Sequence, residues 1–336
     1  RIRMALAYKN MSEAELARSV GPEVFQRVRV INHDINDVVT VGRTRRGTPV
    51  SIFRPVVEAD LLICVGNVEF HYFAGYSGGA KAIVPGVAAP ATITANHAHM
   101  ATPEAVADKL AGNPVREDLE EAVALVGVDF LLNVIVDEQH TVVAACAGNV
   151  AAAHRALCDQ LRQAATVAIF SPVDMAIVSA GGDPKDINLY QAQKALDNCA
   201  GVVRPGGVIV LLAECSEGYG NETFRRWMTA GKEPVELLEQ IRHEFVLGGH
   251  KAAAIAKVAE KAKILLVTSQ QLAGEQPTGI TVYHDLVKAV EAGLGLIGEN
   301  ATYAVFPYGA STLPRLNSRR RNGPAQNSPG KTAPRQ

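Results

Sequence analysis

The sequence predicts an α/β protein of two domains, each a mainly parallel sheet flanked by helices, with the active site in the cleft between them. Short apolar runs of strand length alternate with longer segments whose apolar residues recur at helical spacing. Such alternation is typical of parallel sheets with crossover helices. Glycine-rich loops follow two of the strands, and ligands bind beyond the carboxyl ends of strands in such sheets. The length of 336 residues is enough for two ordinary domains.

The individual elements follow from these patterns. The predicted strands are 28–31, 61–65, 130–136, 166–170, 175–179, 208–212, 264–268 and 303–306. The predicted helices between them are 117–126, 150–164, 189–199, 234–245 and 284–292. A capping box from Ser12 to Glu15 starts a further helix, for which Gly21 is a stop signal. Another start is predicted at Thr102, where a proline and an acid follow the N-cap residue.

The domain boundary is expected near Ser171. The first domain is predicted over residues 1–170, with the segment 302–313 returning to it, and the second over 171–301. The tail 314–336 contains six basic residues after Pro314 and no acidic ones, with a single leucine. Such a segment cannot bury enough apolar area to offset its ordering entropy, so we expect it to be disordered.

Composition limits the classes of partner and compartment. The formal net charge is −1, which favours neither nucleic acid nor a membrane surface as a partner. No apolar run approaches the ~20 residues that a membrane helix needs. The five cysteines are scattered without a Cys-x-x-Cys pair, so we expect free thiols in a reducing, cytoplasmic compartment.

The stretch HYFAGYSGGAKAIVPG, residues 71–86, concentrates the candidate chemistry. A phosphate-binding loop would need a Ser or Thr after its lysine, and Ala82 follows Lys81, although the glycines still allow a looser anion nest. The pattern around Ser77 fits a nucleophile elbow, but Pro85 would stop the helix that must follow it. A serine hydrolase therefore remains a weak alternative.

A third interpretation uses Lys81 as a covalent attachment point and the histidines as metal ligand and base. A lysine amine among glycines is sterically open, and burial would lower its pKa. His97 and His99 follow within 29 residues of His71, and imidazole binds nickel, copper, zinc and iron. Zinc held by His71, His97 and His99 is the generic form of this hypothesis.

The chain resembles the family of nickel-dependent lactate racemases. The resemblance rests on residues 71–81, Pro85-Gly86 and Asn96-His97, and extends over about nine tenths of the chain. It continues through the segments Gly112–Arg116, 129–133 and 190–195. The family binds a nickel pincer nucleotide, a pyridinium mononucleotide that holds the metal through two sulfur-bearing arms and a ring carbon. The resemblance implies racemisation or epimerisation of a small 2-hydroxy acid by proton abstraction and reversible hydride transfer. It also implies cofactor-biosynthesis proteins as partners.

The resemblance also implies roles for particular residues. Lys81 is similar to the lysine that carries the cofactor through a thioamide, and His97 to the protein ligand of nickel. His71 resembles a catalytic acid or base. Gln191 and Lys194 resemble a pair that holds the substrate, with Lys194 near its oxygens. The residues expected to let the backbone approach the nucleotide are Gly75, Ser77, Gly78 and Gly79.

Two departures from the family pattern affect the expected activity. Tyr8 stands where the family usually has a second catalytic histidine, and tyrosine, with a pKa near ~10, is a poorer base. We keep Tyr8 as a candidate acid or substrate contact. The family also has a further N-terminal segment with an arginine that grips the substrate carboxylate, so the chain is expected to be an N-terminally truncated member. A non-catalytic protein that binds the nickel nucleotide is the alternative of a different class.

Overall fold

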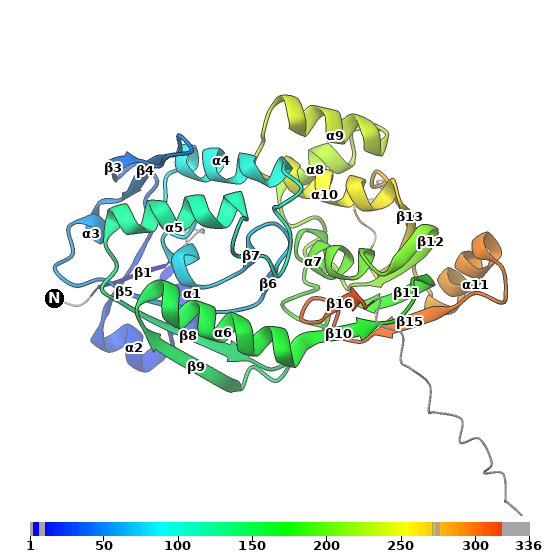
Figure 1. The fold of residues 1–336 in the computed structure, drawn as a ribbon, viewed down its shortest axis with the longest axis horizontal. Helices are drawn as coiled ribbons and strands as arrows, with labels where there is room; N and C mark the ends of the chain where they lie inside the picture. Colours follow the sequence, from blue (N-terminus) through cyan, green and yellow to red (C-terminus); the bar gives the residue numbers. More distant parts are fainter. Residues whose placement is uncertain (1–2, 7–10, 271, 273–275, 318–336) are drawn as a thin grey trace, which may run out of the picture.

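The computed structural model describes residues 3–6, 11–270, 272 and 276–317. Two lobes lie side by side, and the short parallel pair β10–β16 lies between them (Figure 1). The first lobe runs from β1 to α6, and the second contains β11 to β15. Mixed α/β layers with mainly parallel pairing confirm the predicted fold class.

The first lobe is assembled from small sheets wrapped by helices. Its three-stranded sheet has the order β5-β8-β9, in which β5 and β8 run parallel and β9 runs antiparallel. The strands of this lobe are β1 (Arg3–Leu6), β2 (Arg29–Asn32), β3 (Val38–Arg43), β4 (Pro49–Phe53), β5 (Ile63–Asn67), β6 (Phe70–His71), β7 (Gly75–Tyr76), β8 (Phe130–Val136) and β9 (Val142–Gly148). Its helices are α1 (Glu13–Val20), α2 (Pro22–Arg27), α3 (Arg54–Val57), α4 (Pro90–Ala98), α5 (Pro114–Val126) and α6 (Val150–Ala165), with 3₁₀ turns at Gly79–Ala82 and His99–Ala101.

The second lobe contains a five-stranded parallel sheet of order β14-β13-β12-β11-β15. Alternate residues of its strands enter two separate cores, because successive side chains of a strand point to opposite faces. Ile209 and Leu211 pack under α7 and α10, whereas Val208 and Val210 pack against α11. The strands are β11 (Val173–Ser179), β12 (Val203–Leu212), β13 (Ala262–Val267), β14 (Ile280–Tyr283) and β15 (Tyr303–Phe306). The helices are α7 (Leu189–Ala200), α8 (Glu222–Met228), α9 (Pro234–His243), α10 (Gly249–Ala259) and α11 (Leu286–Ile297).

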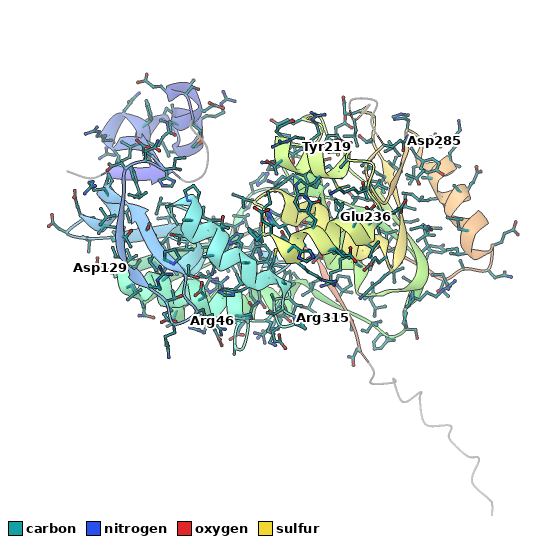
Figure 2. All side chains as sticks on the ribbon, turned by 90° about the horizontal axis from the view of Figure 1, so that it is seen from above. Arg46, Asp129, Tyr219, Glu236, Asp285 and Arg315 are labelled. Atoms are coloured by element: carbon teal, nitrogen blue, oxygen red, sulfur yellow. The ribbon has the colours of Figure 1, made fainter. Side chains whose placement is uncertain are left out.

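The pairing of the last two strands differs from the predicted return of the chain to the first domain. The segment 303–306 was expected in the first domain, but β15 pairs with β11 in the sheet of the second lobe. The chain leaves that sheet only with β16 (Leu313–Leu316), which pairs with β10 (Thr166–Ile169). The first residues of the expected disordered tail are therefore in a strand, and residues 318–336 lie outside the described part. Arg315, at the junction of the lobes in Figure 2, donates to Ala107 O and Asp108 Oδ2 of the first lobe.

The helix predicted from Thr102 is also wrong. Residues 102–112 form turns, and Asp108 has a φ of +66°, which a helix cannot contain. The Asp108 carboxylate instead accepts a hydrogen bond from the Tyr76 hydroxyl and pairs with Arg162. Tertiary contacts thus override a good local start signal. Among the described residues, no helix is long and apolar enough to cross a membrane.

Candidate functional site

The loop between β5 and α4 is fixed by a tight network of backbone and side-chain hydrogen bonds. The Ser77 hydroxyl donates to Asn67 O at 2.9 Å and accepts from the Glu69 N–H at 2.8 Å. The Gly79 N–H donates to Asn133 Oδ1 at 2.7 Å. The buried Arg116 guanidinium donates to the carbonyl of Ala74 at 3.1 Å. These hydrogen bonds therefore hold the loop, and with it the turn that carries Lys81, in one conformation. We call this hydrogen-bonded loop the frame of the site.

Gly79 is required for this frame, because it has a φ of +58° and a Cβ there would lie 2.7 Å from the His154 ring. We expect Gly79→Ala to lower the free energy of unfolding by about 3 kcal/mol, from backbone strain plus overpacking. Gly127→Ala is the matched control: its φ is +79° but nothing lies within 4 Å, so strain alone of about 1 kcal/mol is expected. Urea unfolding of both variants checks this. Equal losses would show that the His154 contact is unimportant.

His71 and Lys81 meet across the loop, with 3.0 Å between Nε2 and Nζ. His71 Nδ1 accepts the Ala74 N–H at 3.3 Å, so the proton of the neutral ring is on Nε2. That proton can then be donated only to an uncharged Lys81 amine. Burial, and then the positive charges of Arg116 and Lys194, lower the pKa of Lys81 well below its ordinary value, which agrees with this assignment. A neutral amine is the nucleophilic form of lysine.

His97 lies on α4 with a ring orientation set by its neighbour. Asn96 donates through Nδ2 to Val115 O and Asp118 Oδ2, which fixes its amide, so its Oδ1 accepts from His97 Nδ1 at 3.2 Å. The lone pair of the neutral His97 ring is therefore on Nε2, the tautomer suited to a metal ligand. Burial, and then Lys81 and His250, lower the pKa of His97 well below its ordinary value. Protons therefore compete little for that lone pair at neutral pH.

The second lobe contributes side chains from α7 and α10. Gln191 and Lys194 lie on α7, whose N-cap Asn188 accepts the Gln191 N–H. His250 and Lys251 lie on the first turn of α10. The His250 ring is 6.1 Å from the His97 ring, and Lys251 Nζ lies 4.6 Å from the centre of the Tyr72 ring, which belongs to the first lobe. The site therefore forms where the lobes meet.

The site is rich in nitrogen bases and poor in carboxylates. Burial is the first cause that lowers the pKa of His71 well below its ordinary value, and Lys81, Lys194, Lys251 and His97 add to it. Burial also lowers the pKa of His250 to about 3. Within the described ranges, no ion pair reaches Lys81 or Lys251. The site therefore holds several nitrogen bases whose low pKa values favour their neutral forms.

His71 lies near Lys81, Lys194 and His97, whose charges contribute to lowering its pKa. The structure therefore places these four predicted residues in one site. Tyr8 lies outside the described residues. Gly75 and Gly78, with φ of +78° and +68°, adopt the backbone conformation that favours glycine, and their role at the nucleotide stays a prediction. The Ser77 hydroxyl, by contrast, is committed to its own turn, and His154 contacts its carbonyl at 2.8 Å. Among the residues that the structure describes, no base is positioned to activate that hydroxyl, which does not support the serine hydrolase alternative.

The generic zinc hypothesis is not supported by the arrangement either. His99 points toward Asp118, with 4.0 Å between Nε2 and Oδ2, and the ring of Phe73 lies between His71 and His97. Across the part of the chain that the structure describes, no group of three or more His, Cys, Asp or Glu side chains is arranged to hold a metal ion. A metal bound here needs ligands beyond the protein.

Sequence reasoning missed His250 and Lys251. Their helix, α10, is rich in alanine and carries no motif, so neither residue stood out. The only signal was that two polar residues begin a segment whose other positions are almost all apolar. Both are buried, at 3% and 4% exposure.

Comparisons with known proteins agree with this arrangement. Two family models match: the lactate racemase N-terminal domain over residues 4–108 and the lactate racemase C-terminal domain over residues 169–313. A lactate racemase of Thermoanaerobacterium thermosaccharolyticum is 32% identical over 311 residues, covering 90% of this chain and 73% of the relative. The chain belongs to the lactate racemase family. Named members of this family are racemases, which are isomerases.

Further family relatives differ in coverage. A lactate racemase of Lactiplantibacillus plantarum is 32% identical over 248 residues, which are 71% of this chain and 58% of that protein. The solved lactate racemase apoprotein of T. thermosaccharolyticum superposes with a TM-score of 0.87 at 30% identity, covering 93% of this chain and 78% of the other. A Thermotoga maritima protein, with a TM-score of 0.70 at 17% identity, shares the fold.

The residues present fit the nickel nucleotide that the family resemblance implies. Lys81 offers a neutral amine, and His97 offers a metal-binding nitrogen with a fixed tautomer. A Cβ at Gly78 would lie 2.8 Å from Asn133 Oδ1, so the packing of the loop that carries Lys81 requires glycine at this position.

Proposed function

We propose that this protein racemises or epimerises a 2-hydroxy acid with a nickel pincer nucleotide bound at the site between the lobes. The observation that carries the proposal is the pairing of Lys81 with His71 at 3.0 Å, beside a histidine whose tautomer is set for a metal. Lys81 would hold the nucleotide covalently, and His97 would bind its nickel. When bound, the cofactor supplies a reversible acceptor for the substrate hydride.

His71 is the group proposed to move the proton. Its imidazole is neutral at physiological pH because its pKa is lowered by burial and by the surrounding cations. To take the proton of the substrate hydroxyl at Nε2, the ring has to adopt the Nδ1–H tautomer and give up the long Ala74 bond. If Lys81 is joined to the cofactor, its amine no longer accepts the Nε2–H of His71. The Nε2–H tautomer then loses the hydrogen bond that favours it.

Lys194 and Gln191 are proposed to bind and orient the substrate. An ammonium near the reacting oxygen opposes the negative charge that grows as the hydroxyl proton leaves. Gln191 can donate and accept hydrogen bonds, which would hold a carboxylate in one orientation. Both residues come from α7, so the second lobe completes the site. The stacked ring of Tyr72, with centroids 5.2 Å apart, keeps the His71 ring in place.

The cysteines and Lys81 also bear on the compartment and the partners of the proposed enzyme. All five cysteines are free thiols, which suits the cytoplasm. Covalent loading at Lys81 would require the proteins that make the cofactor as partners.

Co-expression with the cofactor-making enzymes tests the proposal. The purified protein should contain nickel and turn over at least one enantiomer from a panel of 2-hydroxy acids, followed by chiral chromatography. Nickel with a mass adduct but no turnover would instead indicate a non-catalytic nucleotide-binding protein. Zinc, or no metal, in a folded sample would contradict the proposal.

A further inference from the structure

A buried lysine amine, which no ion pair reaches among the described residues, lies one aromatic ring away from His71. Lys251 is 4% exposed, and its Nζ lies 4.6 Å and 4.9 Å from the ring centres of Tyr72 and Tyr190. Tyr72 in turn stacks on His71. Two aromatic faces compensate only part of the cost of removing an ammonium from water. Lys251 therefore has unused capacity for an acceptor or an anion.

The hydrogen-bond partner of Lys251 has an unsatisfied donor. Lys251 Nζ donates to Gln193 Oε1 at 2.8 Å, and this contact fixes the orientation of the amide. Gln193 is fully buried, and its Nε2 has no hydrogen-bond partner among the described residues. A buried donor without an acceptor is uncommon in folded proteins and indicates a group that binds there.

Asp197 is the acid whose charge acts on Lys251. Burial, and then Lys194, lower the pKa of Lys251 well below its ordinary value, and Asp197 only partly opposes this shift. Burial also raises the pKa of Asp197 to about 6. Lys257 also acts on Asp197. Asp197 therefore does not compensate the burial of a charged Lys251, and an acceptor or anion bound at Lys251 Nζ would stabilise its ammonium form.

The proposed reaction leaves these donors without a role if the substrate is lactate. Lys81 is used by the cofactor and Lys194 faces the reacting end of the substrate. The remaining substituent of lactate is a methyl group, which accepts no hydrogen bond. A methyl group beside Lys251 and Gln193 would leave their donors unpaired.

We infer that Lys251 and Gln193 form a specificity subsite for a substrate whose far end carries oxygen acceptors, either a second carboxylate or a row of hydroxyls. The inference rests on the proposed function, because it assigns the substrate class of the same site. The competing interpretation is purely structural: Lys251, on the second lobe, contacts Tyr72 of the first and holds the lobes together.

The experiment compares lactate, malate and gluconate on the nickel-loaded protein, by kcat/KM and by calorimetric binding. We expect malate or gluconate to exceed lactate by about 10- to 100-fold, the value of one or two charge-assisted hydrogen bonds. A preference for malate identifies a carboxylate, and one for gluconate identifies hydroxyls. Lys251→Met should remove this advantage, so that kcat/KM for the preferred acid falls about 10- to 100-fold more than kcat/KM for lactate. Lys288→Met, an exposed lysine on α11 of the same lobe, should leave the preference unchanged.

The outcomes separate the inference from the proposed function. A wild-type protein that prefers lactate overturns the subsite. If Lys251→Met lowers kcat/KM equally for all three acids, the subsite is also overturned, because an equal loss is what a purely structural role of Lys251 would produce. If Lys251→Met does not fold, the wild-type preference and the variant Gln193→Leu test the subsite instead. Gln193→Leu should then weaken the preference over lactate, and an unchanged preference would contradict the inference. If no acid is turned over, the proposed function fails, while calorimetry with malate and gluconate still tests the subsite.

Discussion

Replacing His71 by glutamine is expected to lower kcat per bound nickel by about 10²- to 10⁴-fold, the usual contribution of a general acid or base. Glutamine keeps the size and a hydrogen-bonding end but cannot accept the proton of the substrate hydroxyl at neutral pH. His243→Gln is the control, because His243 is exposed at the end of α9. The measurement is chiral chromatography of initial rates, normalised to nickel content. A loss below about threefold would remove His71 from the proton-transfer step.

The pH dependence gives an independent check on the same residue. The pKa of His71 is lowered, so its basic form is present above that lowered pKa and is lost only when the pH falls through it. We therefore expect the acid limb of kcat to lie below pH 6.5, the ordinary value for histidine. An acid limb at or above that value would indicate that a different group titrates. His71→Gln should abolish the limb.

Much of the fold could be predicted, because its apolar periodicity is strong. The strand 130–136 and the helix starting at Val150 match the structure residue for residue at those ends. The capping box at Ser12 and the stop at Gly21 are confirmed as well. These features depend on local sequence, which propensity and capping rules describe.

The position of 303–306 could not be predicted, because an apolar strand pairs equally well in either sheet. Tyr303 and Val305 are exposed in β15 while Phe306 is buried against the core of the second lobe. That choice depends on which strand edge is open, here that of β11. Strand order is a property of the assembled sheet rather than of the segment.

Part of the candidate site could likewise be predicted from the sequence, and part of it could not. His71 and Lys81 are ten residues apart in one glycine-rich loop, so their contact follows from the sequence. Lys251 contacts Tyr72, the neighbour of His71, from a helix far along the chain, and a lysine on an alanine-rich helix usually faces water. Asn96 could have been expected from its place beside His97, but its role depends on Asp118 and Val115, which only the fold brings near.

Replacing Lys81 by methionine is expected to abolish covalent loading of the cofactor and, with it, all activity above background. Methionine fills the space of the lysine stem but has no amine, and arginine cannot substitute, because its guanidinium stays charged. The structure supports an uncharged amine here, since His71 can offer Lys81 Nζ only a proton. Intact mass, nickel content and peptide mapping of co-expressed protein measure the loss directly. Lys288→Met, on α11, is the control and should load as the wild type does. A full mass adduct on Lys81→Met would place the attachment at another residue, whereas nickel without an adduct in the wild type would mean that the cofactor is held by His97 and the surrounding bases alone.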